Sequence, residues 1–94
     1  MPRRVIDRIR NAIRNGNYDI THHAVEEMAE DNLGIFDVES AILNGQIKKI
    51  EKEDSRGIKY VIESLGMDQS IPVGVVGRFK ETGIFLIITV YEIT

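Results

Sequence analysis

The chain of 94 residues is 43% hydrophobic and 29% charged, a balance that is typical of one globular domain and excludes a disordered chain. It contains no cysteine, which excludes a disulfide framework, a thiol nucleophile and a zinc site with cysteine ligands, and which suits a reducing cytoplasm. The net charge of -3 and the pI of about 5.3 argue against a dedicated nucleic-acid binder, whose domain is usually basic. We therefore expect a single domain over residues 1–94 in the cytoplasm.

No segment of the chain is predicted to enter a membrane. Residues 1–8 are charged and lack the apolar stretch of a signal peptide. The longest apolar run, Ile84 to Ile88, is far too short to span a bilayer.

Opposite charges are separated along the first half of the chain. Residues 3–14 contain five arginines and one aspartate, whereas residues 17–39 contain seven acidic residues and no lysine or arginine. Two helices whose exposed faces carry opposite charges explain this separation. The alternative is an arginine-rich helix that binds phosphate, which the acidic balance of the whole chain disfavours.

Apolar residues at helical spacing predict two to three helices in the first half of the chain. Glycines and a threonine supply the expected boundaries, because glycine ends helices readily and threonine favours the N-cap position. The expected ranges are about 3–15 before Gly16, 21–34 with Thr21 as N-cap, and 37–44 before Gly45.

The second half of the chain changes to the pattern of strands, with short turn-like links. The expected strands are residues 47–53, 58–65, 72–79 and 84–91, and the expected turns are residues 54–57, 66–70 and 80–83. Links this short favour an antiparallel meander of four strands. Helices followed by strands indicate an α+β domain in which the helices pack on the sheet.

The last predicted strand is apolar on both faces. In a regular strand, alternate residues share a face. One face would carry Ile84, Leu86, Ile88 and Val90, and the other would carry Phe85, Ile87, Thr89 and Tyr91. We therefore expect this strand to be central and covered on both sides, either by two helix layers or by one helix layer and a second copy in a homodimer.

Both histidines of the chain lie side by side at the start of the second predicted helix. Helical geometry places His22 at the border of the apolar stripe, against the edge of the core, and directs His23 away from it, close to Glu27 and Glu30. His23 can contact Glu27 one turn later, and a carboxylate there favours the imidazolium that a general acid needs. A surface pair without function is the alternative. Two such ligands are too few for a metal site.

Several short motifs occur together from Tyr18 onward. They are Thr21-x-His23-Ala24-x-x-x-Met28, Gly34-Ile35-x-Asp37-Val38-Glu39, Asn44-Gly45 and Thr89-Val90-Tyr91. In this order they resemble the bacterial family catalogued as domain of unknown function number 4258. That family is similar in turn to the RelE-like toxins and the wider barnase, EndoU, colicin and RelE group of metal-independent ribonucleases. The resemblance implies a RelE-like fold.

The chain departs from the pattern of that family at three positions. Glu27 and Asp31 stand where the family carries arginines, and Phe36 stands where a polar cap is expected before Asp37. Two positive charges that could serve phosphate are therefore reversed in this chain. A carboxylate repels a phosphodiester unless it acts as a base.

The implied ribonuclease chemistry needs a base, a cation and an acid, and it needs neither a metal nor a cofactor. Glu27 is the candidate base and His23 the candidate acid. Arg78 is the best phosphate clamp because its guanidinium presents a planar fork of donors. Tyr91 can stack on a base or assist proton transfer. Weaker candidates are Lys59 and Tyr60.

Several of these residues also have a structural interpretation. Arg78 can flank an exposed strand end, and Tyr91 can fill the core with its hydroxyl at the rim. Gly74 and Gly77 lie inside a strand pattern, which indicates a bulge or close packing rather than a phosphate-binding loop.

Two functions fit the sequence. The first is a RelE-like, toxin-related protein that acts on RNA as a metal-independent endoribonuclease, or a degenerate form of one, with an antitoxin-like protein as a further partner. The second is a non-catalytic protein-interaction module of the same fold that binds a partner or forms a homodimer.

Overall fold

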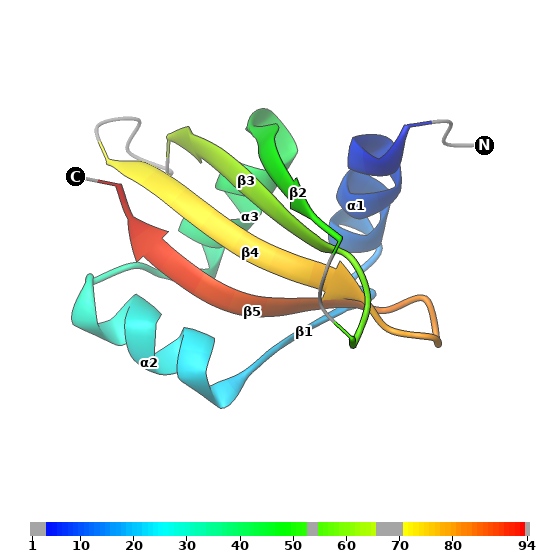
Figure 1. The fold of residues 1–94 in the computed structure, drawn as a ribbon. Coiled ribbons are helices and arrows are strands. Elements are labelled where there is room, and N and C mark those ends of the chain that lie inside the picture. The colour runs from blue at the N-terminus through cyan, green and yellow to red at the C-terminus, as the bar shows by residue number, and fades with distance from the viewer. Residues whose placement is uncertain (1–3, 53–54, 66–70, 94) are drawn as a thin grey trace.

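The computed structural model describes residues 4–52, 55–65 and 71–93. Three helices and five strands lie in these residues (Figure 1). The helices are α1 (Val5–Arg14), α2 (His22–Glu30) and α3 (Ile35–Asn44). The strands are β1 (Tyr18–Ile20), β2 (Gln46–Glu51), β3 (Lys59–Leu65), β4 (Pro72–Phe79) and β5 (Phe85–Glu92). The turn predicted at residues 66–70 lies outside the described residues.

All five strands form one mixed sheet in the order β1-β5-β4-β3-β2. β2 to β5 form the predicted antiparallel meander, whereas β1 pairs in parallel with β5, with Tyr18 opposite Phe85. The predicted sheet of four antiparallel strands therefore lacked β1, the fifth strand, which is parallel to its neighbour. β1 escaped prediction because it has three residues, too few to show an alternation. The α+β class, with helices packed on a sheet, is confirmed.

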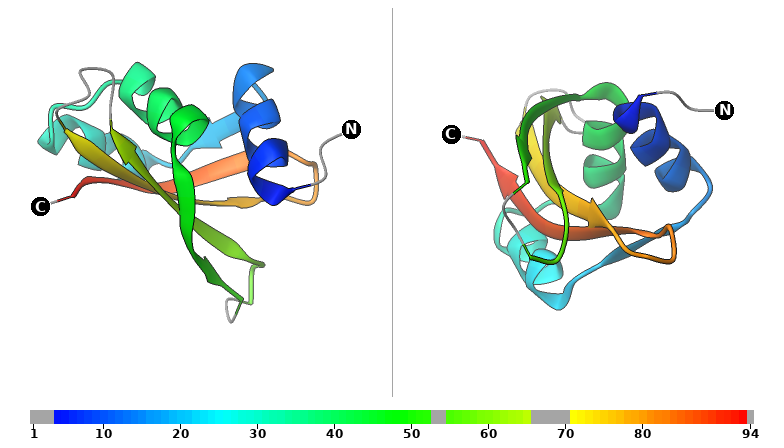
Figure 2. Two further views of the ribbon diagram at one scale, coloured as in Figure 1. Left: turned by 90° about the horizontal axis from the view of Figure 1, so that it is seen from above. Right: turned by 45° about the vertical axis from the view of Figure 1, so that its right-hand side comes forward.

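The helices cover one face and one edge of the sheet. α1 and α3 lie on the same face (Figures 1 and 2), where α3 contacts β3 and β4 and α1 contacts α3. α2 instead runs beside β5, at the edge that β1 covers only in part. Among the described residues no element covers the opposite face, which we call the open face. The predicted cover of β5 by two helix layers is therefore not found in these residues, whereas cover by a second copy in a homodimer stays a prediction. None of the described helices has the length and apolarity needed to cross a membrane.

The core lies between this sheet and the helices α1 and α3. Its largest fully buried side chains are Phe85, Ile9, Ile42, Ile62, Ile87, Val38, Val73, Val75 and Val90. Hydrogen bonds fix the helices that enclose it. Arg10 of α1 donates to the carbonyl oxygen of Gly45 at 2.7 Å and so binds the C-terminus of α3. Asp37 accepts from the backbone N–H of Gly34 at 2.8 Å and so stabilises the N-terminus of α3.

A β-bulge in β5 changes which residues face the core. Val76 lies opposite Thr89, but the next residue, Gly77, lies opposite Ile87, so Ile88 is the extra residue. The alternation therefore shifts by one, and Val90 joins Phe85 and Ile87 in the core while Leu86, Thr89 and Tyr91 lie on the open face. The predicted faces were correct up to Ile88 and wrong for Thr89, Val90 and Tyr91, because sequence alternation cannot reveal an inserted residue.

Two glycines of β4 allow aromatic rings to lie directly on the backbone. A Cβ at Gly77 would overlap the ring of Phe85 and would lie 2.8 Å from the carbonyl oxygen of Leu86, whereas a Cβ at Gly74 would overlap the ring of Tyr91. Both glycines thus serve close packing within a strand, as the sequence predicts.

Replacing these two glycines should have unequal effects. Gly77→Ala should lower the free energy of unfolding by about 3 kcal/mol, because Phe85 is fully buried and cannot move aside. Gly74→Ala should cost about 1 kcal/mol or less, because the outer end of Tyr91 can swing toward solvent. Urea unfolding of both variants checks this difference, and equal losses would contradict it.

Candidate functional site

Thr21 joins α2 to the edge of β5. Its backbone N–H donates to the carbonyl oxygen of Ile87 at 3.0 Å, and its hydroxyl donates to the carbonyl oxygen of Ile88 at 3.0 Å. The same hydroxyl oxygen accepts from the backbone N–H of Ala24 at 3.1 Å, which confirms the predicted N-cap. Thr21 therefore begins the helix at the point where β1 stops covering β5.

Two carboxylates, that of Glu27 in α2 and that of Asp31 at its C-cap, continue this contact along the bare part of β5. Glu27 Oε1 accepts from the backbone N–H of Val90 at 3.1 Å, and Asp31 Oδ2 accepts from the backbone N–H of Glu92 at 3.0 Å. The spacing fits, because four helical residues rise about 6 Å and two strand residues span about 7 Å. The helix thus satisfies strand donors that would otherwise form an unpaired edge.

His23 lies beside this contact. Its Nε2 is 3.4 Å from Glu27 Oε1, the same oxygen that accepts from Val90, and this confirms the predicted contact one helical turn apart. Glu27 is therefore a structural acceptor as well as the partner of His23. Ala24 is the fully buried residue of α2. Around the helix axis, His23 lies on the same side of Ala24 as Glu27 but about 40° further from it. His23 therefore lies toward the open face.

His22 does not pack against the edge of the core, which corrects the prediction for it. Its side chain is 87% exposed, more than the 68% of His23, and its Nε2 lies 2.6 Å from Glu26 Oε1. The apolar stripe is narrower than predicted, since Ala24 and Met28 are buried but Val25 is exposed. The side of α2 that carries Val25 and His22 therefore faces solvent.

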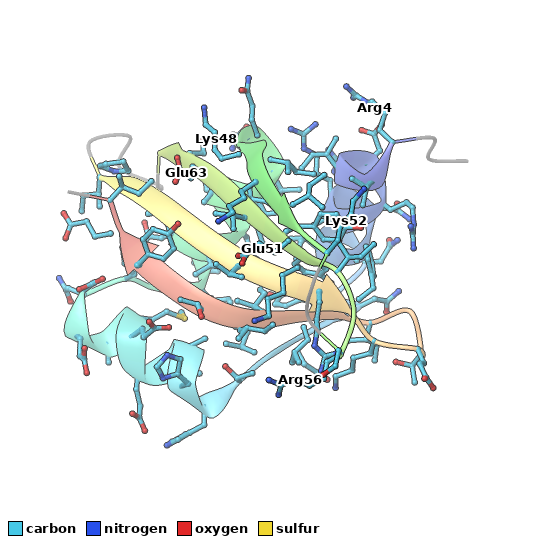
Figure 3. The ribbon with its side chains drawn as sticks, in the orientation of Figure 1. Arg4, Lys48, Glu51, Lys52, Arg56 and Glu63 are labelled. Atoms are coloured by element: carbon cyan, nitrogen blue, oxygen red, sulfur yellow. The ribbon has the colours of Figure 1, made fainter. Side chains whose placement is uncertain are left out.

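A cationic pocket occupies the open face near the start of α2. It has a volume of about 110 Å³ and is lined by Thr21, Arg56, Lys59, Arg78, Leu86 and Ile88. Arg78 Nη1 donates to the backbone carbonyl oxygen of Arg56 at 3.4 Å, so the Arg78 guanidinium lies against the connection that carries Arg56, and both residues line the pocket. Within the described part of the chain no carboxylate lines the pocket, although Glu51 lies opposite Lys59 in the strand register. Figure 3 shows Arg56 at this end of the sheet.

Sequence reasoning found only part of this pocket. It identified Arg78 and, as a weaker candidate, Lys59, but it missed Arg56, which lies in the connection between β2 and β3. No sequence signal links that connection to the middle of the sheet, because the link depends on how the strands pair. Tyr60, the other weak candidate, is buried on the core side and is not part of the site.

Tyr91 lies on the same open face but apart from the pocket. Gly74 is opposite Tyr91 and Arg78 is opposite Leu86, so four residues of β4, about 13 Å, separate the two positions. Burial, together with the nearby charge of Glu63, raises the pKa of Tyr91 above its usual value. The predicted residues thus form three neighbouring features, the pocket at Arg78, the His23–Glu27 pair and Tyr91, rather than one cluster.

A second tyrosine with a raised pKa serves the fold. The hydroxyl of Tyr18 donates to Glu39 Oε2 at 2.6 Å and links β1 to α3. Burial and then this hydrogen bond and charge raise the pKa of Tyr18 to about 12. No group of three or more histidine or acidic side chains able to hold a metal ion occurs in the part of the chain that the structure describes.

The model of the family described as Domain of unknown function (DUF4258) matches residues 20–92. The chain belongs to this family. The DUF4258 region begins at the end of β1 and includes α2, α3 and the other four strands, whereas α1 precedes it. Searches of the curated proteins and of the solved structures found no match. Within this DUF4258 chain, Glu27 and Asp31 act as hydrogen-bond acceptors, a role that arginine cannot fill because it has only donors.

The contact of Glu27 with Val90 should be measurable as stability. Glu27→Ala should lower the free energy of unfolding by about 1 to 2 kcal/mol, because the N–H of Val90 loses its acceptor. Glu27→Gln keeps an acceptor oxygen and should lose less than about 0.5 kcal/mol. Urea unfolding at neutral pH distinguishes the two, and an unchanged stability of Glu27→Ala would show that the contact contributes nothing.

Proposed function

We propose that the protein is a RelE-like, toxin-related protein that binds RNA through the cationic pocket of its open face. One observation carries this proposal: Arg56, Lys59 and Arg78 line one hollow of a chain whose net charge is -3. Guanidinium groups bind phosphate oxygens with paired hydrogen bonds. A lysine beside them adds a further positive charge, so an RNA phosphate is the ligand that suits this pocket best.

The rest of the open face suits a single RNA strand. Tyr91 lies about 13 Å along β4 from the pocket, and its ring covers Gly74. An unpaired base can stack on such a ring while the backbone is held by cations. His23 lies between these positions along the edge, because it follows Thr21 of the pocket and precedes the part of α2 beside Tyr91.

The proposed reaction is cleavage of RNA without a metal. Glu27 takes the proton of a 2′-hydroxyl on the carboxylate oxygen that does not accept from Val90, and the 2′-oxygen attacks the adjacent phosphorus. Arg78 stabilises the charge that develops on the phosphate oxygens, and His23, as the imidazolium beside Glu27, gives a proton to the leaving oxygen as its bond to phosphorus breaks.

A non-catalytic interaction module is the second candidate function. The observation that favours it is the apolar part of the open face, where Val61, Val76, Leu86 and Ile88 are only partly buried. A protein partner, such as an antitoxin-like protein or a second copy of the chain, would cover these side chains. Light scattering after size-exclusion chromatography tests the homodimer, and a monomer at micromolar concentration would exclude it in that range.

Removing the guanidinium of Arg78 should weaken RNA binding. Arg78→Ala should raise the Kd for a short labelled single-stranded RNA by about tenfold, as measured by fluorescence anisotropy at fixed salt. Arg14→Ala is the matched control, because Arg14 is exposed on α1, the arginine-rich helix, and does not line the pocket. A larger effect of Arg14→Ala would assign RNA binding to α1 instead.

Removing the imidazole of His23 should separate cleavage from binding. His23→Ala should slow RNA cleavage by about a hundredfold or more while leaving the RNA Kd unchanged. His22→Ala should cleave normally, since His22 projects into solvent beside Glu26. Cleavage is followed on gels in the presence of a chelator. If the unaltered protein leaves RNA intact, the ribonuclease proposal fails and the binding proposal is judged by the Arg78 experiment alone.

A further inference from the structure

The two edges of the sheet differ in how their backbone groups are paired. On the β5 side, Glu27 and Asp31 accept hydrogen bonds from the part of β5 that β1 leaves bare. On the other side β2 is the last strand, and within the described ranges no element pairs with its outer edge. β2 therefore presents backbone N–H and C=O groups to solvent over six residues, a length of about 20 Å. Such an edge is a template for an added strand.

The side chains along this edge are cationic. Lys48 and Lys49 are exposed on β2, and Lys48 is the extra residue of a bulge between Ile47 and Lys49. Lys52 follows the strand directly. Figure 3 shows Lys48 toward one end of β2 and Lys52 beyond the other. Lys49 and Glu51 both lie on the open-face side of β2, opposite Val61 and Lys59. A strand added to β2 would therefore lie beside lysines, which favours acidic side chains in that strand.

A cavity lies at the beginning of the same edge. It has a volume of about 330 Å³ and is lined by Arg4, Ile6, Arg10, Gly45, Gln46 and Ile47. Its floor is partly apolar, and its two arginines are held in place, since Arg4 pairs with Asp7 at 2.9 Å and Arg10 donates to Gly45. The cavity has room for a side chain at the end of an added strand.

The lysines also exclude the simplest alternative occupant, a second copy of this chain. If two β2 strands paired antiparallel with full overlap, Lys48 of each copy would lie opposite Lys49 of the other. Like charges directly opposite one another destabilise a strand pair, and lysines on an edge are a common protection against self-association. The edge of β2 therefore disfavours pairing with β2 of a second copy, whereas it can pair with a strand of opposite charge.

We propose that the outer edge of β2 binds an extended acidic segment of a partner protein as a sixth strand of the sheet. Backbone hydrogen bonds to β2 supply affinity, and the lysines select acidic side chains. This site shares no lining residue with the pocket at Arg78, so it does not depend on the proposed action on RNA.

A synthetic peptide tests the proposal on the intact protein. The probe is a short labelled peptide that alternates glutamate and valine, and its Kd is measured by fluorescence anisotropy. The double variant Lys48→Glu, Lys49→Glu should raise that Kd by about tenfold or more. Lys80→Glu is the matched control, because Lys80 lies in the turn after β4 and pairs with Asp19, and it should leave the Kd unchanged.

Two further measurements show how the peptide is held. The same peptide with N-methylated amides on one edge should not bind, because it cannot complete a strand ladder. Hydrogen exchange should slow in the amides of β2 and not in those near Arg78. The proposal is overturned if the double variant binds normally, if the methylated peptide binds equally well, or if protection appears at Arg78. It is equally overturned if short RNA protects β2 at lower concentration than the peptide does.

Discussion

The hydrogen bonds between α2 and the bare part of β5 are the constraint on which the rest of the structure depends. β1 is too short to cover β5, and the remaining backbone donors of β5 would be an unpaired edge next to the core. Glu27 and Asp31 accept from those donors, and Thr21 fixes the start of the helix. This arrangement determines where His23 lies and adds Thr21 to the wall of the cationic pocket.

The bulge at Ile88 makes that arrangement possible. By shifting the alternation of β5, it brings Val90 into the core and places Tyr91 on the open face. It also directs the backbone N–H groups of Val90 and Glu92 toward α2. Bulges often occur beside functional sites because they redirect side chains, and here one inserted residue sets both the composition of the open face and the attachment of the helix.

The sequence predicted the regular elements well, because periodicity and glycines are local signals. The three helices and the four long strands lie within one or two residues of their expected positions, except that α2 ends at Glu30, before the end expected near residues 32–34. The Thr21 cap and the His23–Glu27 contact followed from helical spacing. What failed depends on distant parts of the chain. β1 exists only because β5 pairs with it, His22 is exposed because α2 lies at an edge, and Arg56 joins Arg78 only after β2 to β5 have assembled.

The pairing of β1 with β5 also has a consequence for the order of folding. Tyr18 and Phe85 are neighbours in the sheet although they are far apart in the chain, and contacts of this kind form late because a long loop must close first. β5 supplies Phe85, Ile87 and Val90 to the core and all the partners of α2 along the edge. During synthesis the earlier elements therefore have no complete core to join until β5 has left the ribosome. A nascent chain that stops before β5 would expose apolar surface, which makes it a substrate for chaperones and proteases rather than a partly active protein.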